Sequence, residues 1–177
     1  VYEGHIVDRS HAEDIPYRFF EPIFIQLAQL GIHVHIYSHS VPEYLNLLDK
    51  EYSYIHYEGN YSGCELIREM TQYDLGLALF PPEALAYPEL ASANKLAEYL
   101  EAGLPVVTNV NAYAQTITGA NCGGVLDLAQ DDVVSKFREY VKIWIPSDFC
   151  DTHGFTMDAN ANRILEFYQR IKSRKGL

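Results

Sequence analysis

The 177-residue sequence contains no long apolar run and little cysteine. No stretch approaches the roughly 18–20 apolar residues that a membrane-spanning helix needs, so the sequence predicts no transmembrane helix. Its three cysteines stand at positions 64, 122 and 150, without C-x-x-C spacing. An odd number of widely spaced cysteines argues against a disulfide framework. We therefore expect three structural thiols in a reducing compartment, which places the protein in the cytoplasm.

Basic residues are also scarce, since 13 lysines and arginines face 24 acidic residues and the net charge is −11. Residues 163–177 carry five basic residues and one acid, a net of +4, which leaves −15 for the rest of the chain. Because the chain outside residues 163–177 is so negatively charged, it repels nucleic acid, and we expect no nucleic-acid partner. The basic tail permits a peripheral membrane contact. Any anionic ligand needs a helix N-terminus, backbone amides and one or two placed cations.

Three common motifs are missing. The sequence has no G-x-G-x-x-G, no G-x-x-x-x-G-K-[ST] and no G-x-S-x-G, which argues against an ordinary dinucleotide site, a P-loop and a hydrolase elbow. His33 and His35 alternate onto one face of a predicted strand and His39 follows, but no cysteine or acid stands at ligand spacing with them. Because a metal site needs three or four convergent donors, we expect no bound metal.

Apolar segments alternate with segments of helical periodicity along the whole chain. This alternation is typical of βαβ units in a parallel sheet that is covered on both faces. The sequence therefore predicts an α/β fold, a doubly wound parallel sheet of about six strands in the order 3-2-1-4-5-6, within a single domain. The predicted strands cover residues 1–7, 32–38, 54–58, 75–80, 104–109 and 124–128, and the predicted helices cover 17–30, 41–50, 64–72, 92–102, 131–145 and 158–175.

In such a sheet, ligands bind where the strand order reverses, beyond the carboxyl ends of the first and fourth strands. The loops there are 4–18 and 81–94, and the loop 59–64 lies further along the same edge. Ser92 can cap the following helix, whose free amides and positive dipole attract an anion. Lys95 is unfavourable for the dipole of its own helix, so it is either a ligand-binding cation or a solvated lysine. Glu98 can accept hydrogen bonds from vicinal hydroxyls or be an ordinary surface glutamate.

One block of the sequence resembles a known family. Residues 94–107, Asn-Lys-Leu-Ala-Glu-Tyr-Leu-Glu-Ala-Gly-Leu-Pro-Val-Val, are similar to the helix–turn–strand signature of the C-terminal, nucleotide-sugar-binding domain of GT-B glycosyltransferases. Segments 1–6, 54–66 and 73–81 resemble the strand–glycine, strand–helix and strand–proline parts of the same Rossmann-like domain. The resemblance covers residues 1 to about 128.

The resemblance implies roles for individual residues. Glu98 matches the second acid of the family's E-x7-E motif, which binds the ribose, whereas the position of the first acid is Leu90, with Glu89 beside it. His5 stands where the family has an arginine that holds the diphosphate. The base is expected against the loop 59–64. The implied donor-binding residues are Glu98, Lys95, Asn94, Ser92, Gly4, His5, Arg9, Arg18, Asn60 and Tyr61, and no catalytic residue is implied in this chain.

The resemblance also implies a function. It predicts the donor half of a hexosyltransferase-like enzyme of glycan or polysaccharide biosynthesis that uses a UDP-sugar or GDP-sugar and no metal. Residues 155–177 are expected to form the closing helix of this domain, and the acceptor domain is expected to precede it in the full-length protein. The isolated piece is expected to bind donor without turnover. Two alternatives stay open, a sugar-nucleotide epimerase of GT-B architecture and a non-catalytic, degenerate GT-B accessory domain.

Overall fold

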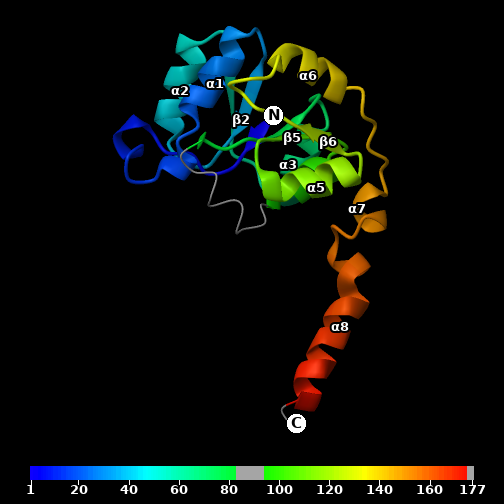
Figure 1. Cartoon of the computed structure of the whole chain (residues 1–177). Helices are drawn as coiled ribbons and strands as arrows, with labels where there is room; N and C mark the ends of the chain where they lie inside the picture. Colours follow the sequence, from blue (N-terminus) through cyan, green and yellow to red (C-terminus); the bar gives the residue numbers. More distant parts are fainter. Residues whose placement is uncertain (83–93, 175–177) are drawn as a thin grey trace.

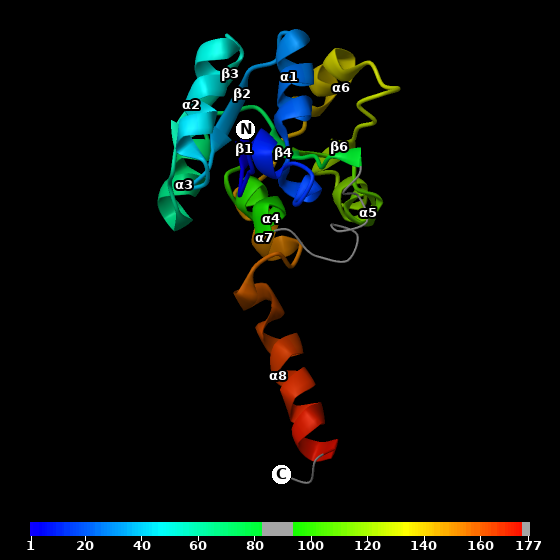
Figure 2. The ribbon, with the colours of Figure 1, turned by 90° about the vertical axis from the view of Figure 1, so that its left-hand side faces the viewer.

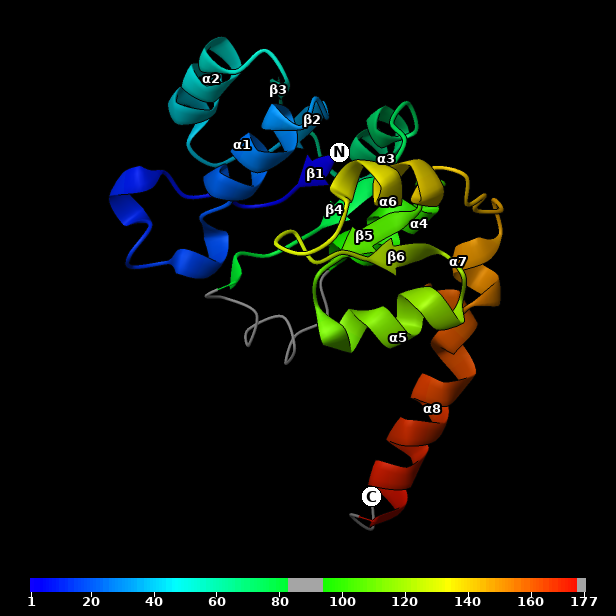
Figure 3. The ribbon, with the colours of Figure 1, turned by 45° about the horizontal axis from the view of Figure 1, so that its top comes forward.

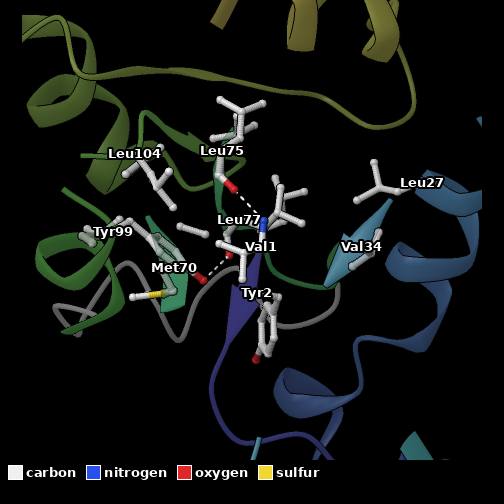
Figure 4. Packing of buried hydrophobic residues seen from close by; sticks show 14 of the residues in the cluster. Val1, Tyr2, Leu27, Val34, Met70, Leu75, Leu77, Tyr99 and Leu104 are labelled. Atoms are coloured by element: carbon white, nitrogen blue, oxygen red, sulfur yellow. Dashed lines mark hydrogen bonds between the residues drawn. The ribbon is translucent and has the colours of Figure 1, made fainter. Parts of the chain in front are cut away.

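The computed structural model describes residues 1–82 and 94–174, and its strands form two parallel three-stranded sheets. The first has the order β1-β2-β3 and the second β4-β5-β6. Val1 joins them, because its nitrogen donates to the carbonyl of Leu75 (2.6 Å) and its carbonyl accepts from Leu77 (2.8 Å; Figure 4). The predicted order 3-2-1-4-5-6 is thus confirmed, with strands β1 (Tyr2–Glu3), β2 (Val34–Tyr37), β3 (Ile55–Gly59), β4 (Gly76–Ala78), β5 (Val106–Thr108) and β6 (Gly123–Val125).

Helices cover both sides of this sheet, with α1 and α6 on one side and α4 and α7 on the other (Figures 1 and 2). Two short 3-10 helices, Arg9–His11 and Pro16–Arg18, lie between β1 and α1. The helices are α1 (Glu21–Gln29), α2 (Pro42–Glu51), α3 (Gly63–Met70), α4 (Asn94–Glu101), α5 (Asn111–Gly119), α6 (Val133–Tyr140), α7 (Phe149–Thr152) and α8 (Met157–Arg174).

The first predicted strand, residues 1–7, is too long. Strand β1 ends at Glu3 because Gly4 takes a φ of +138°, which turns the chain out of the sheet. The amide of Ile6 then donates to Oγ of Ser40 (2.8 Å) and not to a neighbouring strand. The turn brings the segment after β1 over the carboxyl end of the sheet, where the expected ligand loops lie.

Two helix boundaries and one predicted loop also differ from the prediction. Helix α1 begins at Glu21, with Pro22 in its first turn, because residues 16–18 form a separate 3-10 helix. Asp132, and not Asp131, caps α6 by accepting from the amide of Ser135 (3.1 Å). The predicted loop 146–154 contains the short helix α7. Local patterns therefore locate α1 and α6 and miss only their ends, whereas they miss the short helix α7 altogether.

A large aromatic side chain packs directly onto β4. Tyr99 of α4 is completely buried, and a Cβ added at Gly76 would lie 2.3 Å from its Cγ. The hydroxyl of Tyr99 accepts from the amide of Glu3 (2.9 Å) and donates to the carbonyl of Leu77 (3.3 Å). Tyr99 therefore fixes α4 against the ends of both β1 and β4, which determines where the first turn of α4 lies.

Helix α8 occupies most of the predicted closing segment 155–177 but extends away from the body of the domain (Figures 1 and 3). Its contacts with the rest of the described chain run mainly through α7. Leu165 and Phe167 are 58% and 54% exposed. Within the described residues, no helix is both long and apolar enough to cross a membrane.

Candidate functional site at the carboxyl ends of β1 and β4

A half-buried ammonium group lies where β1 and β4 end side by side. Nζ of Lys95, in the first described turn of α4, is 4.1 Å from the centre of the Tyr2 ring and 5.6 Å from those of Phe20 and Phe80. Aromatic faces attract a cation and cost it part of its hydration. Lys95 takes part in none of the ion pairs within 4.0 Å that the described residues form. Among the residues that the structure describes, the desolvated cation therefore has no direct counter-ion.

Glycine at position 4 makes room for this ammonium. A Cβ added there would lie 3.2 Å from Nζ of Lys95 and 3.1 Å from Oη of Tyr2. The φ of +138° is also one that other residues rarely adopt. The backbone of the β1 loop can therefore approach Lys95 closely, so backbone and ammonium can face the same small anion.

The carboxylates of Glu3 and Glu98 balance the charge of Lys95 from beyond the 4.0 Å of a direct ion pair. Burial lowers the pKa of Lys95 to about 8, and the charges of Glu3 and Glu98 oppose this fall. Burial raises the pKa of Glu3 to about 7, with Lys95 acting against the rise and Glu98 adding to it. Lys95 and Glu98 are three residues apart on α4 and so share a face of the helix. The site therefore combines the ammonium of Lys95 with two acids, Glu98 on the same helix and Glu3 at the end of β1.

Arg18 and His5 lie beside this group. Burial is the main cause of the lowered pKa of His5, followed by the charge of Arg18 and then by His39, whose ring centre is 5.4 Å away. Arg18 also contributes to the lowered pKa of Lys95, after burial. Its guanidinium lies over the ring of Tyr17 at 5.4 Å. Five predicted residues are thus brought together, namely Gly4, His5, Arg18, Lys95 and Glu98.

Three other predicted residues, Arg9, Asn60 and Tyr61, lie apart from this group. Nε of Arg9 donates to both carboxylate oxygens of Glu21 (2.8 Å each), and Tyr44 also donates to that carboxylate. Asn60 and Tyr61 are exposed beyond the end of β3, where the Tyr61 ring lies 5.7 Å from that of Tyr37. Asn94 is exposed at the first described position of α4. Ser92, like Glu89 and Leu90, lies outside the described residues.

Sequence analysis did not identify Glu3 or the aromatic rings around Lys95. An acid directly before the glycine that ends the first strand was the available signal for Glu3. The sequence pattern predicts only that Phe20 and Phe80 are buried. Hydrophobic periodicity does not show which buried ring lies beside a cation.

A cavity of about 820 Å³ lies next to this site, at the carboxyl ends of β5 and β6. Its lining includes Pro81, Asn109 and Asp127 but not Lys95. The side chain of Asn109 accepts from the amide of Phe80 (2.9 Å) and donates to its carbonyl (2.7 Å), which fixes the entry of the loop after β4. The volume is in the range of small-molecule sites.

The chain matches a known family and a solved structure. Residues 21–140, more than half of the chain, match the family described as glucosyltransferase 3-like, C-terminal domain. AviGT4, a glycosyltransferase involved in avilamycin A biosynthesis, has a similar fold, with a TM-score of 0.67 and 18% sequence identity. The similarity covers 97% of this chain and 51% of AviGT4, so the chain spans about half the length of that protein. No curated protein matches the sequence.

These findings confirm the predicted resemblance to the C-terminal domain of a glycosyltransferase, and the sheet order agrees with the doubly wound fold that it implied. The chain belongs to the glucosyltransferase 3-like family, of which it contains the C-terminal domain.

Proposed function

We propose that this chain binds the nucleotide-sugar donor of a glycosyltransferase, which transfers the sugar from UDP or GDP to an acceptor. The observation that carries the proposal is the half-buried ammonium of Lys95, held over Tyr2 beside the open backbone of Gly4. A desolvated cation at the strand-order reversal of a doubly wound sheet suits a diphosphate. The net charge of −11 makes such a placed cation necessary.

The diphosphate would lie between Lys95, Arg18 and the β1 loop. Transfer breaks the bond between the anomeric carbon and the diphosphate oxygen, so negative charge grows on the leaving group. A fixed ammonium in a water-poor site stabilises that charge without reorganising. His5, which is neutral at pH 7 because its pKa is lowered by burial and by Arg18, can donate one hydrogen bond.

The nucleoside would extend along the sheet edge from this point. Glu98 accepts hydrogen bonds from the ribose hydroxyls, as the matching acid of the E-x7-E motif implies. Asn60 and Tyr61, beyond β3, contact the base. Arg9 is held by Glu21 in the free protein and reaches the phosphates only if that ion pair opens.

The acceptor and the remaining catalytic groups would belong to an N-terminal domain, which we propose to precede Val1. This arrangement is supported by the length of AviGT4, of which this chain spans only about half. The exposed apolar residues of α8 suit a contact with that domain, and the basic residues 163–177 suit a peripheral contact with a membrane in the cytoplasm. We propose a hexose as the sugar, a glycan or polysaccharide as the product, and a transfer reaction that needs no metal at the donor site.

The test is donor hydrolysis by the intact protein. We expect release of UDP or GDP from one of a panel of hexose donors, detected by mass spectrometry. Release of no nucleoside diphosphate, with or without candidate acceptors, would contradict the proposal. Recovery of the donor with one inverted sugar centre would instead indicate an epimerase.

The pKa values predict how diphosphate binding depends on pH. Lys95 binds an anion only when protonated, and its pKa is about 8, so affinity should fall as the pH rises through 8. Ionisation of Glu3, whose pKa is about 7, acts in the same direction. We expect UDP affinity to fall about tenfold or more between pH 7 and pH 9. The arginine of Lys95→Arg stays protonated over this range, so in that variant we expect only the smaller fall in UDP affinity that the ionisation of Glu3 causes. Equal pH profiles for the two proteins would contradict this role of Lys95.

A further inference from the structure

Three histidines converge on one face of β2 and β3, away from the donor site. His33 and His35 are two residues apart and so point to the same face, and His35 pairs directly with His56 of β3 in the strand register. One ring nitrogen from each of the three lies within 4.8 Å of the others. His39 does not join this histidine cluster, since its ring lies next to that of His5.

The three rings are closely packed and held by neighbours. The centre of the His56 ring lies 4.5 Å from that of His35 and 5.0 Å from that of His33. Nδ1 of His33 is 2.7 Å from Nε2 of His56. Tyr54 and Tyr73 support the cluster, with ring centres 4.6 Å from His33 and His35, respectively. One hydrogen bond accounts for the His33–His56 contact but not for the convergence of a third imidazole.

A carboxylate orients one of these histidines. Oε1 of Glu58 lies 2.7 Å from Nδ1 of His35, which leaves Nε2 of that ring for another partner. A carboxylate hydrogen-bonded to the far nitrogen is the usual support of a metal-binding histidine.

The cluster is accessible from solvent. His33 is exposed, and His35 and His56 are half-buried. His33 and His35 also line a cavity of about 710 Å³ together with Tyr73 and Asp74. This opening gives a metal ion an entry path and leaves space for a water ligand.

We propose that the histidine cluster binds one divalent transition-metal ion, with Zn²⁺ as the first candidate. His33, His35 and His56 supply three imidazole nitrogens, a water completes the tetrahedron, and Glu58 orients His35. Zinc–nitrogen bonds of about 2.0–2.1 Å place ligand nitrogens about 3.3 Å apart. The His33–His56 pair therefore opens by about half an ångström while the third nitrogen moves closer. The ion would tie the edge strand β3 to β2, at a place distinct from the donor site.

Zinc titration of the intact, metal-free protein without a polyhistidine tag tests this proposal. We expect calorimetry to show one Zn²⁺ per chain, and at about 100 times the Kd we expect Tm to rise by about 5–10 °C. Nuclear magnetic resonance of the wild-type protein should show the imidazole signals of His33, His35 and His56 shifting together. Zinc binding that shifts other histidine signals and not these three would overturn the proposal, as would the absence of stoichiometric binding.

Substitutions give a second readout. His35→Gln and His56→Gln should each weaken Zn²⁺ binding at least tenfold, and Glu58→Gln should weaken it about 10-fold. The matched control is His11→Gln, because His11 is also bonded to a carboxylate, that of Asp8 (2.9 Å), but stands outside the cluster. Unchanged zinc affinity in both His35→Gln and His56→Gln, with native circular dichroism, would also overturn the proposal.

Discussion

Replacing Lys95 with methionine is expected to weaken UDP or GDP binding about 10- to 100-fold while the affinity for the corresponding nucleoside changes little. The ammonium lies half-buried over Tyr2 and forms no direct ion pair with another described residue, so its loss removes a charge-assisted contact with the diphosphate worth about 1.5–3 kcal/mol. Methionine keeps the length of the side chain and packs well against the aromatic rings that surround it. Titration calorimetry with a nucleoside diphosphate and its nucleoside measures both affinities.

The matched control for this experiment is Lys50→Met. Lys50 is an exposed lysine near the end of α2, so its substitution makes the same change in net charge without touching the site. We expect it to leave both affinities within about twofold, since exposed charges are screened by solvent. If both variants lose the same affinity for the nucleoside diphosphate, the effect comes from overall charge and not from the site. If Lys95→Met loses as much affinity for the nucleoside as for the diphosphate, Lys95 does not make a specific diphosphate contact.

Replacing Glu98 with glutamine is expected to weaken nucleoside and nucleoside diphosphate binding alike, by about tenfold or more. A carboxylate can accept from both ribose hydroxyls, whereas the amide has a single acceptor atom, and hydrogen bonds to charged groups contribute about 1.5–3 kcal/mol. The substitution also removes a negative charge that raises the pKa of Glu3. Titration with the nucleoside and with its 2′- and 3′-deoxy analogues measures the effect.

Two comparisons make the Glu98 result specific. Glu101→Gln changes an exposed glutamate at the end of the same helix and should leave nucleoside affinity unchanged. The deoxy analogues should bind the wild-type protein more weakly than the ribonucleoside, and this preference should shrink in Glu98→Gln. If the variant distinguishes ribose from deoxyribose as well as the wild-type protein does, Glu98 does not contact the ribose.

The sequence was sufficient to predict the order of the sheet and that the loop after β1 lies near the start of α4. Apolar strand segments alternating with helices are typical of a doubly wound sheet. In the common order 3-2-1-4-5-6, which the structure has, the ends of β1 and β4 come together. The strand lengths were less predictable. A glycine at φ +138° ended β1 at Glu3, and periodicity alone does not reveal a backbone angle.

Contacts between residues that are far apart in the sequence explain why the roles of Arg9 and of the histidine cluster were not predicted. Arg9 was expected to bind the donor, but the carboxylate of Glu21 on α1 binds it, and Tyr44 of α2 donates to the same carboxylate. The histidine cluster required the register of β2 against β3, which places His56 beside His35. Such pairings depend on how the helices and strands pack, so they are absent from any local pattern.

Titration of the intact wild-type protein with UDP, GDP and ADP is the most direct test of donor binding by this domain. We predict that UDP or GDP binds with one site per chain, more tightly than ADP and more tightly than its own nucleoside. Failure of all three nucleotides to bind the intact, folded protein would contradict the donor-site assignment.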